Sequence, residues 1–103
     1  MIRESERKDM PRYLTGRRDN NEKDLCTLIV VLGGVYIPMH ESAGFDLVVI
    51  FTNGTHVVEV KNPESKWKLT EAEKDTKEAV ELAGGIYHIV QTDDDIIKLK
   101  NKE

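Results

Sequence analysis

The sequence predicts a single α/β domain in which a mixed β-sheet is flanked by helices. Its 103 residues match the commonest size of one domain. The dipeptide Asn53-Gly54 lies between two runs rich in β-branched residues, which is the strongest short-range signal of a β-hairpin. Segments with helical spacing lie on either side of that hairpin and end at paired glycines, Gly33–Gly34 and Gly84–Gly85. Strands interleaved with helices are typical of the α/β class.

The first regular element follows an N-terminal arm. The arm, residues 1–19, contains Pro11 and Gly16 and shows no sustained periodicity. Residues 19–21 offer N-caps for a helix that ends at Gly33–Gly34. Its apolar residues recur at helical spacing: Leu25, Leu28, Ile29 and Leu32. Residues 35–40 are then expected to form a short strand.

Turn and capping signals predict the remaining elements. Pro63 ends the second hairpin strand, because proline cannot donate to a sheet. Thr70, with Glu73 three residues later, forms a capping box at the start of a helix that ends at Gly84–Gly85. The predicted order is α-β-β-β-α-β-α. The two hairpin strands are expected over residues 45–51 and 56–61, and the second helix over residues 71–83. A fourth strand over residues 86–90 and a last helix over residues 93–100 complete the domain.

Composition excludes several classes of protein. Charged residues make up 33% of the chain, but dense apolar runs at 25–32 and 47–51 can build a core, unlike a disordered chain. No run approaches the roughly 20 apolar residues of a membrane helix. The charged first ten residues lack the apolar stretch of a signal peptide. The single cysteine, Cys26, suits a reducing compartment, so we expect a soluble cytoplasmic protein.

Charge is unevenly distributed along the chain. The net charge of −4 argues against a bulk polyanion binder. Basic residues nevertheless crowd the first quarter: Arg3, Arg7, Lys8, Arg12, Arg17, Arg18 and Lys23. Two interpretations are open. The segment is either a solvated terminus or a basic arm whose Arg12, Arg17 and Arg18 contact a phosphate backbone.

The hairpin predicts which side chains share a face of the sheet. If Asn53-Gly54 is the two-residue loop, the threonines on either side of it pair. Counting outward, Val48 then faces Glu59. Two residues further from the turn, Asp46 faces Lys61. Opposed Cβ atoms lie roughly 4.5–5.5 Å apart and diagonal ones about 7–8 Å apart, so Asp46 and Glu59 can reach one cation between them.

These charges occur in an apolar context that permits two interpretations. Apolar residues on both faces predict that the hairpin is buried on both sides, and buried carboxylates are uncommon unless paired or bound to metal. The pattern also fits a structural Asp46–Lys61 ion pair with Glu59 solvated. Glu22, on the inward face of the first helix, is either a further acid of the site or a first-turn acid favoured by the helix dipole.

Four segments resemble one nuclease family. Ala43-Gly44-Phe45-Asp46-Leu47 and, after the hairpin turn, Val58-Glu59-Val60-Lys61 are similar to the PD-(D/E)xK nuclease motif. Lys68-Leu69-Thr70 at a helix start and Ala83-Gly84-Gly85 before a strand resemble the VRR-NUC branch, the virus-type replication-repair nucleases, in the small stand-alone form found in bacteriophages. The resemblance runs over residues 21–99. It implies a restriction-endonuclease-like core and the cytoplasm of a bacterial or phage-infected cell.

The resemblance also implies roles for particular residues. Asp46 and Glu59 would ligate Mg²⁺ or Mn²⁺, with the Val60 carbonyl as a further ligand and Glu22 close by. Lys61 would position or activate the attacking water and stabilise charge on the phosphate. Hydrolysis of a phosphodiester needs an activated water and relief of developing charge, which a carboxylate-held Mg²⁺ and an adjacent ammonium supply. Hard oxygen ligands favour Mg²⁺ or Mn²⁺ over zinc.

Other positions leave alternatives open. The family usually has proline where this chain has Phe45, and often glutamine where it has Glu73. Glu73 therefore either contacts the substrate or only caps its helix. Lys66 and Lys68 are candidate DNA contacts. Trp67 between them either stacks on a base or sugar or anchors its loop.

The resemblance implies a structure-specific DNA endonuclease for the domain of residues 20–103. Stand-alone members of this branch resemble Holliday-junction resolvases, and a homodimer with two active sites suits two cuts in a four-way junction. The alternatives are a flap or nicking nuclease of DNA replication or repair, and a non-catalytic DNA-binding module on the same fold. Val30 and Val31 widen the apolar stripe of the first helix, where either a partner chain or neighbouring elements cover them.

Overall fold

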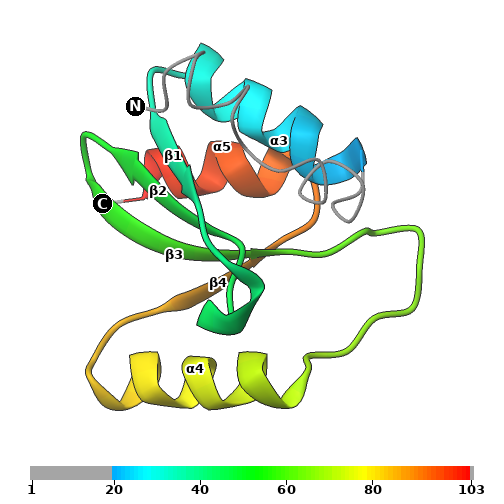
Figure 1. The fold of residues 1–103 in the computed structure, drawn as a ribbon. Helices are drawn as coiled ribbons and strands as arrows, with labels where there is room; N and C mark the ends of the chain where they lie inside the picture. The colour runs from blue at the N-terminus through cyan, green and yellow to red at the C-terminus, as the bar shows by residue number, and fades with distance from the viewer. Residues whose placement is uncertain (1–19, 103) are drawn as a thin grey trace.

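The computed structural model of the chain describes residues 20–102. The predicted mixed α/β class is confirmed, with a four-stranded mixed sheet and three α-helices in the described part (Figure 1). In chain order the elements are α3 (Asn20–Val31), β1 (Val35–Pro38), the 3₁₀ turn η1 (Glu41–Ala43), β2 (Leu47–Phe51), β3 (Gly54–Val60), α4 (Glu71–Leu82), β4 (Tyr87–Val90) and α5 (Asp93–Asn101).

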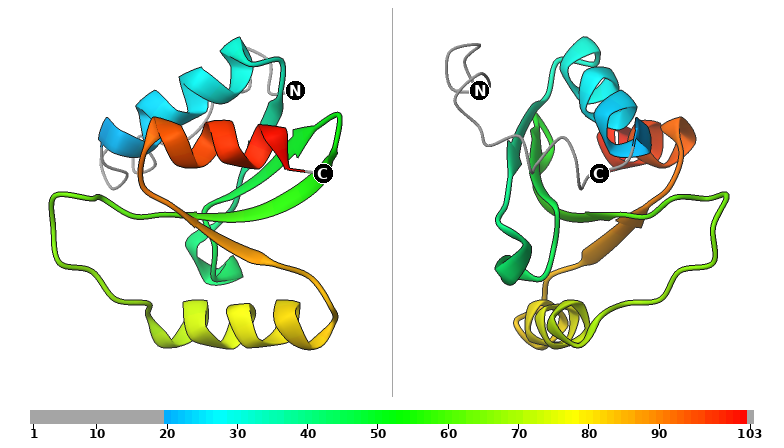
Figure 2. Two further views of the ribbon diagram at one scale, coloured as in Figure 1. Left: turned by 180° about the vertical axis from the view of Figure 1, so that it is seen from behind. Right: turned by 45° about the vertical axis from the view of Figure 1, so that its right-hand side comes forward.

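The sheet separates two layers of helices. Its strand order is β1-β2-β3-β4, with β1–β2 and β2–β3 antiparallel and β3–β4 parallel. Helices α3 and α5 lie together on one face, and α4 lies on the other (Figures 1 and 2). The main core lies between the sheet and the α3–α5 layer. Its fully buried side chains are Leu25, Ile29, Leu47, Val49, Val58 and Ile96.

The hairpin turn differs from the prediction by two residues of register. Phe51 pairs with Gly54, so the loop is Thr52–Asn53 and not Asn53-Gly54. A type I′ turn needs positive φ at both central residues, but no non-glycine residue of the described part has positive φ. Asn53 has a different role. Its Nδ2 donates over 2.6 to 3.0 Å to three carbonyl oxygens at the end of α5, those of Leu99, Lys100 and Lys102.

The slip moves the predicted partners but keeps the predicted faces. Leu47 pairs with Val58, the last pair at this end of the hairpin, and the Asp46 amide also donates to the Val58 carbonyl at 3.1 Å, so Asp46 does not lie opposite Lys61 as predicted. Side chains alternate between faces with a period of two, so a two-residue slip leaves each side chain on its original face. Asp46 lies next to Glu59, because its amide donates to the Val58 carbonyl and its Oδ2 accepts from the Val60 amide, the two residues that flank Glu59.

Two further expectations are corrected. The hairpin is not buried on both sides, since Ile50 on β2 is 37% exposed and Ile37 on β1 is 42% exposed. The reason is that α4 packs against η1 and β4, towards one end of that face. The first strand also ends at Pro38, because His40 caps η1 by accepting a hydrogen bond from the Ser42 amide at 3.1 Å. Within residues 20–102, none of the helices combines the length and apolar content needed to cross a bilayer.

Two histidines pack together on the α5 side of the sheet. The rings of His56 and His88 meet edge to face with centroids 5.4 Å apart. Burial, the nearby His56 and the charge of Lys102 lower the pKa of His88 to about 4. Burial and Lys102 also lower the pKa of His56. Both rings are therefore neutral in the folded protein at neutral pH.

We expect acid to destabilise the protein through His88. In the unfolded chain its pKa returns to about 6.5, so the unfolded state takes up a proton first. The difference between the two pKa values corresponds to at most about 3 kcal/mol, and solvent around the half-buried ring reduces it, so the free energy of unfolding should fall by about 1–2 kcal/mol as the pH drops from 6.5 towards 4. Urea denaturation of wild type and His88→Gln at pH 7 and pH 4.5 measures this loss. The same loss in both proteins would contradict the assignment, and exposed His40→Gln is the control.

Candidate functional site

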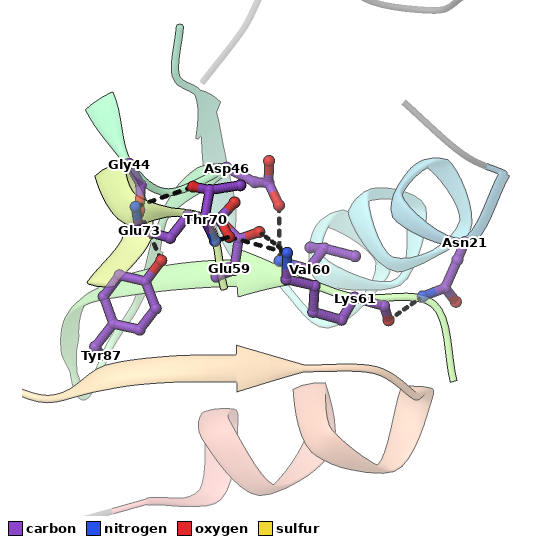
Figure 3. A network of polar contacts seen from close by, with 9 residues as sticks. All are labelled: Asn21, Gly44, Asp46, Glu59, Val60, Lys61, Thr70, Glu73 and Tyr87. Atoms are coloured by element: carbon purple, nitrogen blue, oxygen red, sulfur yellow. Dashed lines mark hydrogen bonds and ion pairs between the residues drawn. The ribbon is translucent and has the colours of Figure 1, made fainter. Parts of the chain in front are cut away.

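Backbone hydrogen bonds to two neighbouring segments fix the position of Asp46. It lies directly before β2, where its carbonyl oxygen accepts from the Met39 amide at 2.8 Å and its own amide donates to the Val58 carbonyl at 3.1 Å. Its Oδ2 accepts from the Val60 amide at 2.8 Å (Figure 3). The side chain is thus oriented towards the end of β3, where the other predicted site residues lie.

Glu59 is a buried carboxylate with one unsatisfied oxygen. It lies on β3 and is 2% exposed. Its Oε2 lies 3.2 Å from Lys61 Nζ, whereas its Oε1 is buried without a hydrogen-bond partner. Burial, reinforced by the carboxyls of Glu73 and Asp46 and opposed by Lys61, raises the pKa of Glu59 to about 9. The alternative in which Glu59 is solvated is therefore wrong.

Lys61 bridges two carboxylates beside this position. Its Nζ lies 3.0 Å from Glu73 Oε1 and 3.2 Å from Glu59 Oε2. Burial alone would lower the pKa of Lys61, but its hydrogen bonds to both carboxylates outweigh that effect and raise it. Lys61 therefore remains a cation at the end of β3.

Glu73 connects this lysine to the start of α4. The predicted capping box is confirmed, since Glu73 Oε1 accepts from the Thr70 amide at 2.9 Å and Thr70 Oγ1 accepts from the Glu73 amide at 3.1 Å. The same Oε1 also accepts from Lys61 Nζ. The cap and the ion pair thus share one oxygen, and α4 positions Lys61 through it.

Tyr87 completes the network and was missed by the sequence reasoning. Its buried hydroxyl donates to the Gly44 carbonyl at 2.6 Å, which ties β4 to the segment before Asp46 (Figure 3). Burial and the surrounding carboxylates raise the pKa of Tyr87, so it stays protonated. It shares the face of Glu59 because Val57 pairs with Tyr87 in the parallel register of β3 and β4. No signal in the sequence specifies that register.

The start of α3 lies at the same end of the sheet. Asn21 Nδ2 donates to the Lys61 carbonyl at 3.0 Å and to the Gln91 carbonyl at 3.1 Å. Asn21 was expected only as a capping residue, but it lies within the first turn and joins α3 to the ends of β3 and β4. Glu22, the next residue, is 6% exposed, which agrees with the inward position predicted for it.

The predicted DNA-contacting residues fall into two groups. Arg12, Arg17 and Arg18 lie outside the described residues. Lys66 and Lys68 are exposed in the loop between β3 and α4. Trp67, between them in the sequence, has its ring centroid 5.8 Å from Lys61 Nζ, so the loop passes close to Lys61.

The carboxylates of the site form a pair and not a larger cluster. Among residues 20–102, no three His, Cys, Asp or Glu side chains are grouped closely enough to hold an ion. Glu22, Asp46 and Glu59 are thus not assembled into a three-ligand site, and the close pair is Asp46 and Glu59. Mg²⁺ is commonly held by one or two carboxylates with waters, and the unsatisfied Glu59 Oε1 is a hard oxygen donor. The pair fits Mg²⁺ or Mn²⁺.

Comparisons with known proteins give no family for this chain. No protein-family model, curated protein or solved structure matches it. The function is therefore inferred from the residues of the site and their arrangement.

Proposed function

We propose that the protein is a metal-dependent, structure-specific DNA endonuclease with a restriction-endonuclease-like core of the PD-(D/E)xK type. The observation that carries the proposal is Glu59. The residue is 2% exposed, its Oε1 has no hydrogen-bond partner, and its Oε2 lies 3.2 Å from Lys61 Nζ. Asp46 is close enough to contribute to its raised pKa. Such burial is unfavourable for stability alone, and groups arranged against stability are typical of functional sites.

Each residue of the site would have a separate role in phosphodiester hydrolysis. Asp46 and Glu59, with the Val60 carbonyl, would hold Mg²⁺ or Mn²⁺. The bound metal supplies Lewis acidity and lowers the pKa of a water molecule. The Lys61 ammonium can donate to a phosphate oxygen or orient the water, as a compact cation suits both tasks. Glu73 keeps that ammonium in place through its 3.0 Å contact.

Basic residues would supply contacts to the DNA backbone. Lys66 and Lys68 are exposed beside the site, and Arg12, Arg17 and Arg18 extend the positive charge in the N-terminal arm. Contacts of this kind bind DNA without reading its sequence. Recognition would then depend on the shape of the substrate, for which a four-way junction is the leading candidate.

A cleavage assay tests this function. Labelled four-way junction, flap and linear duplex DNA are incubated with Mg²⁺, Mn²⁺ or EDTA. We expect cleavage of the junction with either metal and none with EDTA. Cleavage of the flap or single nicks alone would favour a replication or repair nuclease. Binding of DNA without cleavage would favour a non-catalytic module and contradict the enzyme.

We also propose that the protein acts as a homodimer. Val31 is 73% exposed and Val30 is 42% exposed, so the neighbouring elements within residues 20–102 leave both uncovered. Light scattering at micromolar concentration should give about twice the 11.7 kDa of one chain. Val31→Asp should lower this mass, because a buried charge opposes association. A mass near 11.7 kDa with junction cleavage intact would contradict the paired-site mechanism.

A further inference from the structure

Trp67 is a partly exposed aromatic ring beside the candidate site. It lies in the loop that joins β3 to α4. The centroid of its ring lies 5.8 Å from Lys61 Nζ. The residue is 38% exposed, which leaves a large apolar surface in water. Lys66 and Lys68 on either side of it are exposed. An exposed indole with a lysine before and after it in the sequence, and a third lysine 5.8 Å from its ring centroid, has the composition of a nucleotide-binding surface.

The loop that carries this ring is held in shape by its own hydrogen bonds. Asn62 Oδ1 accepts from the Glu64 amide at 2.8 Å, and the Asn62 carbonyl accepts from the Ser65 amide at 3.4 Å. At its other end the loop enters the capping box of α4 at Thr70. These anchors on both sides of the ring reduce the conformational freedom that the loop loses when a ligand binds.

We propose that Trp67 stacks on an unpaired base of the DNA, next to the phosphate that contacts Lys61. This inference rests on the proposed function and specifies its substrate. Bases along a strand are spaced by about 3.4 Å, so a ring 5.8 Å from the ammonium lies within about two nucleotides of that phosphate. Both contacts can therefore be made by one stretch of strand.

The unpaired state of the base follows from stacking itself. Inside a duplex both faces of each base are covered by neighbouring bases. A side chain can stack only where the stack is interrupted, as in single strands, flaps and the branch points of junctions. Trp67 would thus place such an interruption beside Asp46 and Glu59, and a continuous duplex would lack this contact.

The experiment uses the intrinsic fluorescence of the full-length protein. Trp67 is the only tryptophan of the chain, so the signal reports this ring alone. The protein is titrated in EDTA with an oligothymidylate of about ten nucleotides and with a blunt duplex several times longer, so that its two ends, where a base face is open, are a small share of the binding sites. Anisotropy of dye-labelled DNA measures binding independently. We expect the oligothymidylate to quench the fluorescence and the duplex to bind with little quenching.

Variants separate stacking from a structural role. Trp67→Ala should weaken oligothymidylate binding about 5- to 150-fold and duplex binding little, since stacking contributes about 1–3 kcal/mol per base. Trp67→Phe should retain most of the affinity, because phenylalanine also stacks. Lys68→Ala is the matched control and should weaken both ligands alike, because a phosphate contact does not distinguish them. Circular dichroism verifies that each variant is folded.

The outcomes distinguish this inference from the proposed function. Binding of oligothymidylate without quenching, together with unchanged affinity in Trp67→Ala, would overturn the stacking inference even if the junction is cleaved. Equal quenching by the blunt duplex would overturn the preference for unpaired bases. If no DNA binds and none is cleaved with Mg²⁺, the endonuclease proposal fails and this inference fails with it.

Discussion

Asp46→Ala or Glu59→Ala is expected to abolish metal-dependent DNA cleavage, with a loss of at least about 100-fold in rate. Each substitution removes one of the two adjacent carboxylates proposed to hold the metal. DNA affinity measured in EDTA should change little, because the basic residues that would contact phosphates remain. The rate is measured on the labelled four-way junction in Mg²⁺. Glu78→Ala, an exposed position on α4, is the matched control and should cleave normally.

Glu59 offers a second readout that does not depend on activity. Its buried carboxyl lies against Glu73 and Asp46, and burial with these neighbours raises its pKa to about 9. Because the unfolded chain ionises this carboxyl at a lower pH than the folded protein does, a raised pKa costs stability at neutral pH. Glu59→Gln keeps the shape and cannot ionise, so it should raise the metal-free melting temperature. Mg²⁺ should stabilise the wild type but not this variant, because a ligand stabilises only a fold that binds it. Wild-type cleavage in both alanine variants would refute the site.

Gly44→Ala is expected to cause the largest loss of stability, about 3 kcal/mol or more. Gly44 has a φ of +80°, which L-residues rarely adopt. A Cβ there would also collide with Thr76 Oγ1 and lie 2.6 Å from the Ala72 carbonyl oxygen. Both atoms belong to α4, so the substitution pushes this helix away from the segment that precedes Asp46. Urea denaturation measures the loss.

A second glycine separates close approach from backbone strain. Gly84 has a φ of +88°, but a Cβ there would meet nothing within 4 Å. Gly84→Ala should therefore cost only about 1 kcal/mol, the strain of a left-handed residue. Equal losses in the two variants would show that the contact between Gly44 and α4 contributes nothing. A small loss at Gly44 would contradict the close packing of α4.

Local sequence signals were sufficient to predict the helices and strands and the face of the sheet on which the candidate residues lie. Paired glycines, the capping box at Thr70 and Glu73, and the two β-rich runs act within a few residues of the structure they specify. The common face of Asp46 and Glu59 survived a wrong turn prediction, because strand side chains alternate with a period of two and the slip was two residues.

The contacts that build the site were decided only by the tertiary structure. Asn53 does not adopt the predicted turn, because its side chain binds carbonyl groups of α5, 46 to 49 residues away. Tyr87 reaches Gly44, 43 residues away, through the parallel pairing of β3 and β4. Such pairings depend on how α4 and α5 pack against the sheet, so they cannot be predicted from the periodicity within a strand. The sequence by itself determined which residues could form the site, and packing determined which of them meet.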